Sequence, residues 1–169
     1  MSAMATELTI EAQRPGAEVY HGDALCRKKS MELLEEISLP LGLLPLEDIQ
    51  EVGYNRSTGF VWLRQRKAKN HLFKKINRLT SYGTEITALA QERRLKKVTG
   101  VKTRELLIWV SLTEIHIDDP ASGKITFKTP TGLFRSFPVT AFDVEEAEVK
   151  RIGEAAEMEV AAAAAAAAE

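Results

Sequence analysis

The feature that most constrains the fold of this chain is a series of short apolar runs over residues 39–142, interrupted at intervals by Gly, Pro and Asn. Runs of about four to eight residues bounded by such turn formers are typical of β-strands. No amphipathic helical pattern separates one run from the next. Because strands joined without crossover helices pair antiparallel, the sequence predicts a mainly β fold, either an antiparallel roll or a partly open barrel.

One amphipathic helix is predicted before the strands, from Asp23 to Glu36. Its apolar stripe recurs with helical spacing and consists of Cys26, Ser30, Leu33, Leu34 and Ile37. Asp23 is placed to accept hydrogen bonds from the free N–H groups of the first turn. The stripe predicts that the helix docks on the β-domain. Pro40 and Pro45 then force an extended segment, residues 39–46, whose five leucines are expected to be buried.

The most informative strand pattern spans residues 106–117. Apolar residues first occupy one parity and then switch to the other, at Ile115 and Ile117; the first set is Leu106, Ile108, Val110 and Leu112. A β-bulge near Thr113 or Glu114 would return both halves to one face of the sheet. Leu107 and Trp109 have the opposite parity, which predicts that the helix or the leucine-rich segment covers them.

The length of 169 residues fits one domain with tails. Residues 1–18 show no sustained period and are predicted to be disordered. Residues 19–142 are predicted to form a single β-rich domain with its N-terminal helix. Residues 143–169 are a Glu/Ala-rich tail with eight consecutive alanines, for which a frayed helix or a disordered segment is expected.

The net charge of −1 conceals a strong asymmetry: residues 1–63 carry −5, residues 64–104 carry +11 and residues 105–169 carry −7. The middle therefore forms either a basic surface or a part of the fold that the acidic flanks neutralise. The candidate ligand-binding residues are the cations Arg64, Arg66, Lys67, Lys69, Lys74 and Lys75. Such a cluster would attract an amphipathic ligand, an anionic lipid or an acidic protein, and we expect it to bind anionic vesicles in a salt-dependent manner. Phe73 and Tyr82, the nearby aromatics, are expected in the core, so no specific nucleic-acid binding is predicted.

No catalytic or cofactor-binding signature is present in the sequence. The chain has no Gly-x-Ser-x-Gly pentapeptide and no Gly-rich phosphate loop. Its three histidines, His21, His71 and His116, are dispersed, and only His116 has acids close in sequence, Asp118 and Asp119. One cysteine and three scattered histidines do not give the ligand spacing of a zinc site. We therefore predict no catalytic residue, no metal and no cofactor, and a non-enzymatic role is favoured.

The sequence also bears on location. Cys26 is the single cysteine and cannot form an intramolecular disulfide, and the N-terminus lacks the basic start and apolar run of a signal peptide. No segment approaches the roughly 20 apolar residues of a transmembrane helix. These features predict a cytoplasmic protein with, at most, peripheral contact to membranes.

Several segments, in their order and spacing, resemble the plant family known as domain of unknown function 538. They are the helix with Cys26 and Arg27, and the stretches at residues 39–45 (LPLGLLP), 51–54 (EVGY), 99–102 (TGVK), 106–110 (LLIWV), 122–125 (SGKI) and 129–132 (TPTG). The resemblance implies a plant protein of the leaderless type with a compact, mostly β, barrel-like or roll fold. Family members have been likened to lipid-binding bactericidal permeability-increasing proteins, and hydrolysis of chlorophyll-like esters has been proposed for them.

The resemblance supplies no residue motif for either role. The sequence therefore leads first to a non-enzymatic β-domain that binds an amphipathic small molecule or an anionic lipid. The alternatives are a carboxyl-ester hydrolase acting on chlorophyll-like or lipid esters, and a protein-interaction module whose basic face meets an acidic partner.

Overall fold

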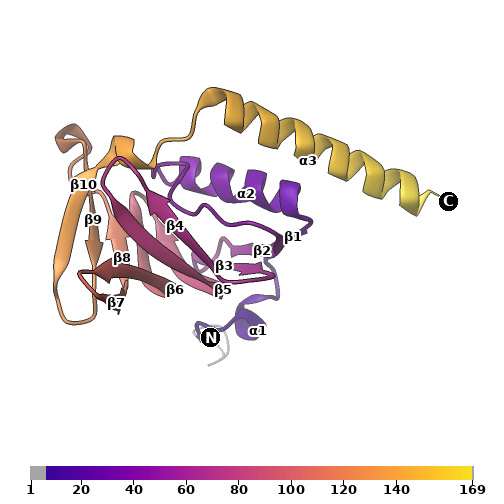
Figure 1. The fold of residues 1–169 in the computed structure, drawn as a ribbon. Helices are drawn as coiled ribbons and strands as arrows, with labels where there is room; N and C mark the ends of the chain where they lie inside the picture. The colour runs from indigo at the N-terminus through magenta and orange to yellow at the C-terminus, as the bar shows by residue number, and fades with distance from the viewer. Residues whose placement is uncertain (1–6, 169) are drawn as a thin grey trace.

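The computed structural model describes residues 7–168. Within these residues, antiparallel strands form one open sheet, and two helices, α2 and α3, lie on one side of it (Figure 1). The helices are α1 (Ile10–Gln13), α2 (Asp23–Glu36) and α3 (Glu146–Ala167). The strands are β1 (Glu18–His21), β2 (Ile49–Asn55), β3 (Phe60–Gln65), β4 (Lys69–Phe73), β5 (Arg78–Gln91), β6 (Arg94–Glu105), β7 (Ile108–Ser111), β8 (Glu114–His116), β9 (Lys124–Lys128) and β10 (Phe134–Pro138).

The strand order is β1-β2-β3-β5-β6-β8-β9-β10, with β4 paired to the first part of β5 and β7 to the last part of β6. Each described pair is antiparallel. The prediction of a mainly β antiparallel fold is therefore confirmed. The sheet curves around α2 but does not close, because β1 and β10 remain at opposite edges.

Short turns join neighbouring strands of the sheet. Asn55 pairs with Phe60 across the β2–β3 hairpin, and Gly59 in that connection has a positive φ of 84°. Gln91 pairs with Arg94, so the long hairpin of β5 and β6 turns through two residues. Strand β4 follows β3 after a short connection and pairs with the first part of β5.

Helix α2 has the predicted bounds and the predicted buried stripe. Cys26, Ser30, Leu33 and Leu34 are buried along it, and Ile37 is buried just after its end. The stripe joins a core formed by the inner faces of the strands and by the leucine-rich segment, in which Leu39, Leu43 and Leu46 are buried and Leu41 and Leu44 are partly buried. The expectation that all five leucines are buried therefore holds fully for three of them.

The cap of α2 differs from the prediction. The carboxylate of Asp23 accepts hydrogen bonds from Ile49 N (2.9 Å) and Arg27 Nε (3.2 Å) rather than from the helix start. The free N–H groups of Ala24 and Leu25 instead donate to the two carboxylate oxygens of Glu159, each at 3.1 Å. A residue of α3 thus supplies the cap, because Gly22 at the N-cap position has no side chain to do so.

Replacing Glu159 with alanine is expected to lower the free energy of unfolding by about 1 kcal/mol, since two helix N–H groups lose a charged acceptor. Urea denaturation of this variant and of Glu157→Ala would measure the effect. Glu157 is the matched control because it is an exposed glutamate on the same helix. Equal urea midpoints for the two variants would show that the Glu159 cap does not contribute to stability.

The N-terminal segment is more ordered than predicted. Thr9 caps the single turn of α1, and Ile10 and Gln13 are buried. Ile10 packs with Phe60 and Trp62 in a second, smaller core on the outer face of β3. Residues 7–18 are therefore part of the folded unit, which corrects the predicted disorder; residues 1–6 lie outside the described residues.

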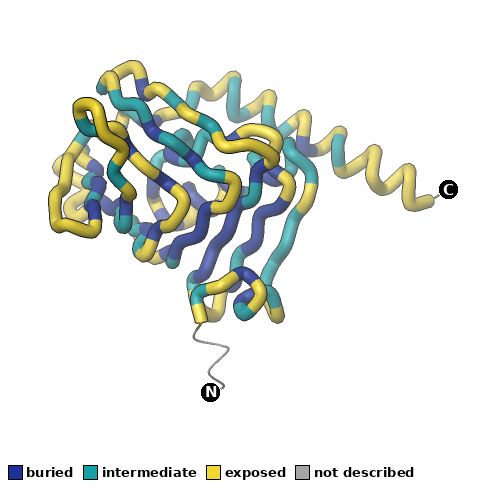
Figure 2. The backbone as a smooth tube through the Cα atoms, turned by 60° about the horizontal axis from the view of Figure 1, so that its bottom comes forward, coloured by how far each residue is buried: buried dark blue, intermediate teal, exposed yellow. Residues whose placement is uncertain are grey.

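The C-terminal tail also differs from the expected frayed or disordered segment. Residues 146–167 form the continuous helix α3, which packs on α2 and then extends beyond the sheet (Figure 1). Ala156 is buried in this contact. The alanine run is exposed along its length (Figure 2). High helix propensity and the anchoring by the first turns together account for the order.

The predicted bulge near Thr113 is placed differently in the structure. Residues 112–113 separate β7 from β8, so the predicted strand is divided in two. The additional unpaired residues lie on the partner strand β6, where Lys97 and Gly100 have positive φ angles of 51° and 81°. Leu112, Ile115 and Ile117 are all buried as the pattern required. Leu107 and Trp109 are exposed, so the prediction that a second layer covers them is wrong.

Candidate functional site

The space between α2 and the inner face of the sheet cannot hold a ligand. The cavity there is lined by Leu34, Val61, Ile86 and their neighbours and measures about 10 Å³, which is room for at most one water molecule. The core is therefore packed and leaves no room for an amphipathic molecule between α2 and the sheet. A binding site has to be sought outside the core.

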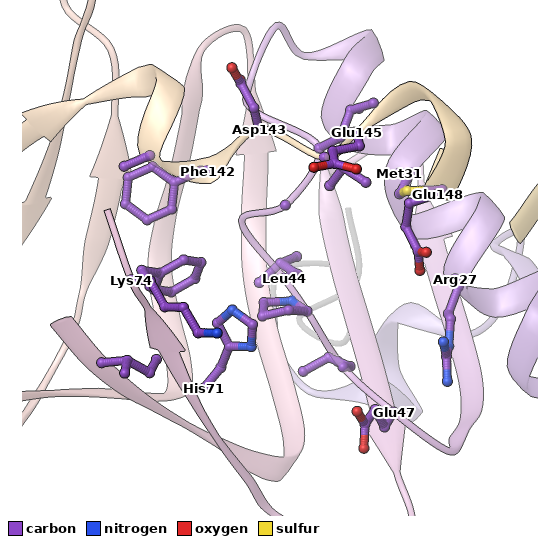
Figure 3. A pocket seen from close by; sticks show the side chains of 18 of the residues that line it. Arg27, Met31, Leu44, Glu47, His71, Lys74, Phe142, Asp143, Glu145 and Glu148 are labelled. Atoms are coloured by element: carbon purple, nitrogen blue, oxygen red, sulfur yellow. The ribbon is translucent and has the colours of Figure 1, made fainter. Parts of the chain in front are cut away.

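A pocket of about 560 Å³ lies between the edge strand β4 and the helices (Figure 3). One bank consists of β4 and the turn that follows it. The opposite bank consists of α2, the segment after β10 and the first turns of α3. The leucine-rich segment passes beneath the opening. Gly42 holds this segment in place, since its N–H donates to the carbonyl oxygen of Phe142 at 2.8 Å and a Cβ there would meet that oxygen at 2.4 Å.

The lining is largely apolar. It is formed by Met31, Leu41, Leu44, Leu46, Leu72, Phe73, Phe142, Val144 and Ile152. Phe73 and Phe142 stack edge-to-face with ring centroids 4.7 Å apart, and the His71 ring meets Phe73 at 4.6 Å. These contacts give the pocket a rigid aromatic side below the charged groups of its rim.

Three of the six predicted ligand-binding residues reach this pocket: Lys69, Lys74 and Lys75. The ammonium of Lys69 pairs with Glu47 at 2.8 Å, and that of Lys75 donates to the carbonyl oxygen of Thr140 at 3.0 Å. Lys74 makes no ion pair or hydrogen bond with another described side chain and points into the pocket in Figure 3. It is therefore available to an anionic group at the mouth.

The other three predicted residues lie elsewhere. Arg64, on β3, sits among three carboxylates: Glu85 at 3.3 Å, and Glu11 and Glu51 at 3.8 Å. Arg66 and Lys67 are exposed in the connection to β4 and do not line the pocket. The predicted cluster is therefore divided, and carboxylates from the N-terminal segment, β2 and β5 neutralise Arg64.

The rim also carries residues that sequence reasoning did not select. Arg27 comes from α2 and pairs with Asp23, while Asp143, Glu145 and Glu148 line the bank opposite β4 (Figure 3). Burial lowers the pKa of His71, the charge of Lys69 lowers it further, and Glu47 opposes this effect. His71 is thus neutral at pH 7, and positive charge on its bank comes from lysines alone.

The remaining histidines lie in ion-pair networks. His21 Nε2 lies 2.9 Å from Glu51, and His116 Nε2 lies 3.3 Å from Asp118, the local pairing that the sequence indicated. Among the described residues that line the pocket, none is Ser, Thr or Cys. No group of three or more described His, Cys, Asp or Glu residues is arranged to hold a metal ion. In the part of the chain that the structure describes, no helix has the length and apolar character needed to cross a bilayer.

Comparison with known proteins places the chain in a family. A family model described as protein of unknown function, DUF538, matches residues 30–143, which is more than half of the chain. The chain belongs to the DUF538 family. No curated protein and no solved structure matches it significantly. The DUF538 match includes the leucine-rich segment, β4 and Phe142, but ends before α3, so Glu148 and Ile152 of the pocket lie outside it.

Proposed function

We propose that this DUF538 protein binds an amphipathic small molecule with an acidic headgroup and an apolar tail in the pocket beside β4. The observation that carries the proposal is Lys74, a cation with no ion pair among the described residues, at the mouth of an apolar pocket. Other cations of the rim are engaged: Arg27 by Asp23, and Lys69 by Glu47. An acidic headgroup is favoured on this bank because it would give Lys74 the partner that it lacks.

The size and lining of the pocket support a small ligand. Small-molecule sites typically measure about 300–1,000 Å³ and combine apolar walls with a few polar groups, and this pocket, at about 560 Å³, has that composition. The acidic residues Asp143, Glu145 and Glu148 lie on the opposite bank. They orient the ligand, since they repel an acidic headgroup from their side and favour it beside Lys74.

The same pocket gives less support to the two alternatives. A carboxyl-ester hydrolase would need an activated nucleophile within reach of a base, and the described lining offers His71 as a base without a Ser, Thr or Cys beside it. A protein-interaction module would need the six basic residues on one face, whereas Arg64 is neutralised by neighbouring carboxylates.

Calorimetric titration with decyl sulfate and decyl maltoside tests the proposal, because the two probes share a tail and only decyl sulfate has a charged, compact headgroup. The wild-type protein is expected to bind decyl sulfate more tightly. Lys74→Gln should weaken binding of decyl sulfate about tenfold and leave decyl maltoside unaffected. Leu72→Gln, at an exposed position of the lining, should weaken both.

Lys67→Gln is the matched control, since Lys67 is also an exposed lysine of the basic stretch but lies outside the pocket. Equal loss of affinity in Lys67→Gln and Lys74→Gln would mean that general charge, not the pocket, attracts the probe. Absence of binding by either probe to the wild-type protein would contradict the proposed function itself.

A further inference from the structure

The tip of the β6–β7 hairpin exposes an unusual amount of apolar surface. Leu106, Leu107 and Ile108 are 94%, 85% and 64% exposed, and Trp109 follows them on the surface. Scattered apolar residues are normal on a protein surface, but four consecutive ones at a hairpin tip are not. These are the residues that the strand pattern predicted to be covered, and no described element covers them.

The conformation of the turn does not favour leucine at its central positions. Glu105 pairs with Ile108, so Leu106 and Leu107 form a two-residue loop. Leu106 has a positive φ of 53°. Two-residue hairpin turns favour Asn and Gly because these residues tolerate positive φ, which a branched apolar side chain adopts only with strain. Leu106 therefore neither packs against other residues nor stabilises the turn conformation.

A second exposed apolar segment lies beside the tip. Leu133 and Phe134, at the start of β10, are exposed, Phe134 to 61%. Arg135 binds the carboxylate of Glu105 at 3.3 Å, which ties the β9–β10 loop to the hairpin. Both segments lie at the end of the sheet that is remote from the free end of α3 (Figure 1). We name this surface, made of residues 106–109 and 133–134, the apolar tip.

Basic residues surround the apolar tip. Residues 102–109 and 128–135 contain four cations, Lys102, Arg104, Lys128 and Arg135, and one carboxylate, Glu105, for a net charge of +3. The carboxylate is compensated by Arg78 at 2.9 Å as well as by Arg135. Arg104 lies over the Trp109 ring at 5.8 Å. Exposed apolar side chains with a tryptophan and a basic margin are the composition of surfaces that enter the headgroup region of anionic membranes.

We propose that the apolar tip inserts into the surface of an anionic lipid bilayer, with the basic residues contacting the headgroups. The positive charge disfavours a second copy of this chain as the occupant, because a symmetric contact would bring two such surfaces together. Membrane attachment at the apolar tip is separate from ligand binding beside β4: the two sites share no residue.

Sedimentation with phosphatidylcholine vesicles, with and without about a third of phosphatidylserine, tests the insertion at low and high salt. The wild-type protein should bind the anionic vesicles, and less so at high salt. The double substitution Leu106→Gly/Leu107→Asn should reduce binding at least tenfold while keeping the fold, since glycine suits the first loop residue, where φ is positive. Met158→Gln is the control for an exposed apolar residue elsewhere.

Tryptophan fluorescence supplies a second readout on the unmodified protein. Trp62 is fully buried, whereas Trp109 is exposed, so acrylamide quenching reports on Trp109. Anionic vesicles should protect Trp109 from quenching. The proposal is overturned if the Leu106/Leu107 variant binds as well as the wild type, if quenching is unchanged, or if neutral and anionic vesicles bind alike. Lys74→Gln should bind vesicles normally, which separates failure of this proposal from failure of the ligand site.

Discussion

Replacing Leu34 with alanine is expected to lower the free energy of unfolding by about 3–5 kcal/mol, the range for fully buried leucines. Leu34 is completely buried on the inner side of α2 and lines the small residual cavity of the core. Tight packing around it leaves little room for neighbours to relax into the space. Urea denaturation monitored by circular dichroism measures the change in midpoint.

Glu35→Ala is the matched control, because Glu35 is the next residue of the helix and is exposed. It should change the free energy of unfolding by less than about 0.5 kcal/mol. A Leu34→Ala variant as stable as the control would mean that α2 does not dock through the stripe.

Replacing Glu51 with glutamine is expected to cost about 2–4 kcal/mol at neutral pH, as removal of one partner leaves buried polar groups and charges without compensation. Its side chain is only 12% exposed and binds Arg14 at 2.9 Å and the Trp62 indole N–H at 2.7 Å. Because Arg14 follows α1, this carboxylate fastens the N-terminal segment to the sheet. Glu11→Gln, at a largely exposed glutamate, is the control.

The effect of Glu51→Gln should depend on pH. The hydrogen bonds from Arg14 are the largest influence on Glu51 and, together with those from Trp62 and His21, lower its pKa from 4.5 to about 2 although burial opposes them. A carboxylate with a lowered pKa in the folded state stabilises the fold at pH values above its pKa in the unfolded chain. This stabilisation is lost as the pH falls through its pKa in the folded protein. The depression corresponds to about 3 kcal/mol. The stability difference between wild type and Glu51→Gln should therefore shrink between pH 5 and pH 2; a difference that stays constant in acid would contradict this assignment.

Local patterns in the sequence were sufficient where local interactions determine the structure. The bounds of α2 and its buried stripe follow from helical periodicity, and the antiparallel strands follow from short apolar runs bounded by turn formers. The N-terminal segment was missed because α1 is a single turn that is held by Ile10 against Phe60 and Trp62, and a single turn has no detectable period.

The candidate pocket was predictable only in part, because it is assembled from distant segments. Charge alone identified Lys69, Lys74 and Lys75, which share one strand and its turn. The opposite bank comes from α2 and from residues near the start of α3, more than 100 positions apart in the chain. Nothing in the local sequence of Glu148 or Ile152 indicates that α3 returns to α2, and the acids that neutralise Arg64 were likewise distant.

The cap of α2 has a consequence for the order in which the protein is completed during synthesis. Helix α2 is made early and contributes Leu33, Leu34 and Ile37 to the core, but the acceptor for Ala24 and Leu25 N–H is 134–135 residues further along the chain. Until Glu159 has left the ribosome, those two groups can be satisfied only by water. The nascent chain can therefore form its sheet around α2 before the first turn of α2 is capped by Glu159. The side of the pocket that α3 contributes forms in the same last step, when α3 packs on α2.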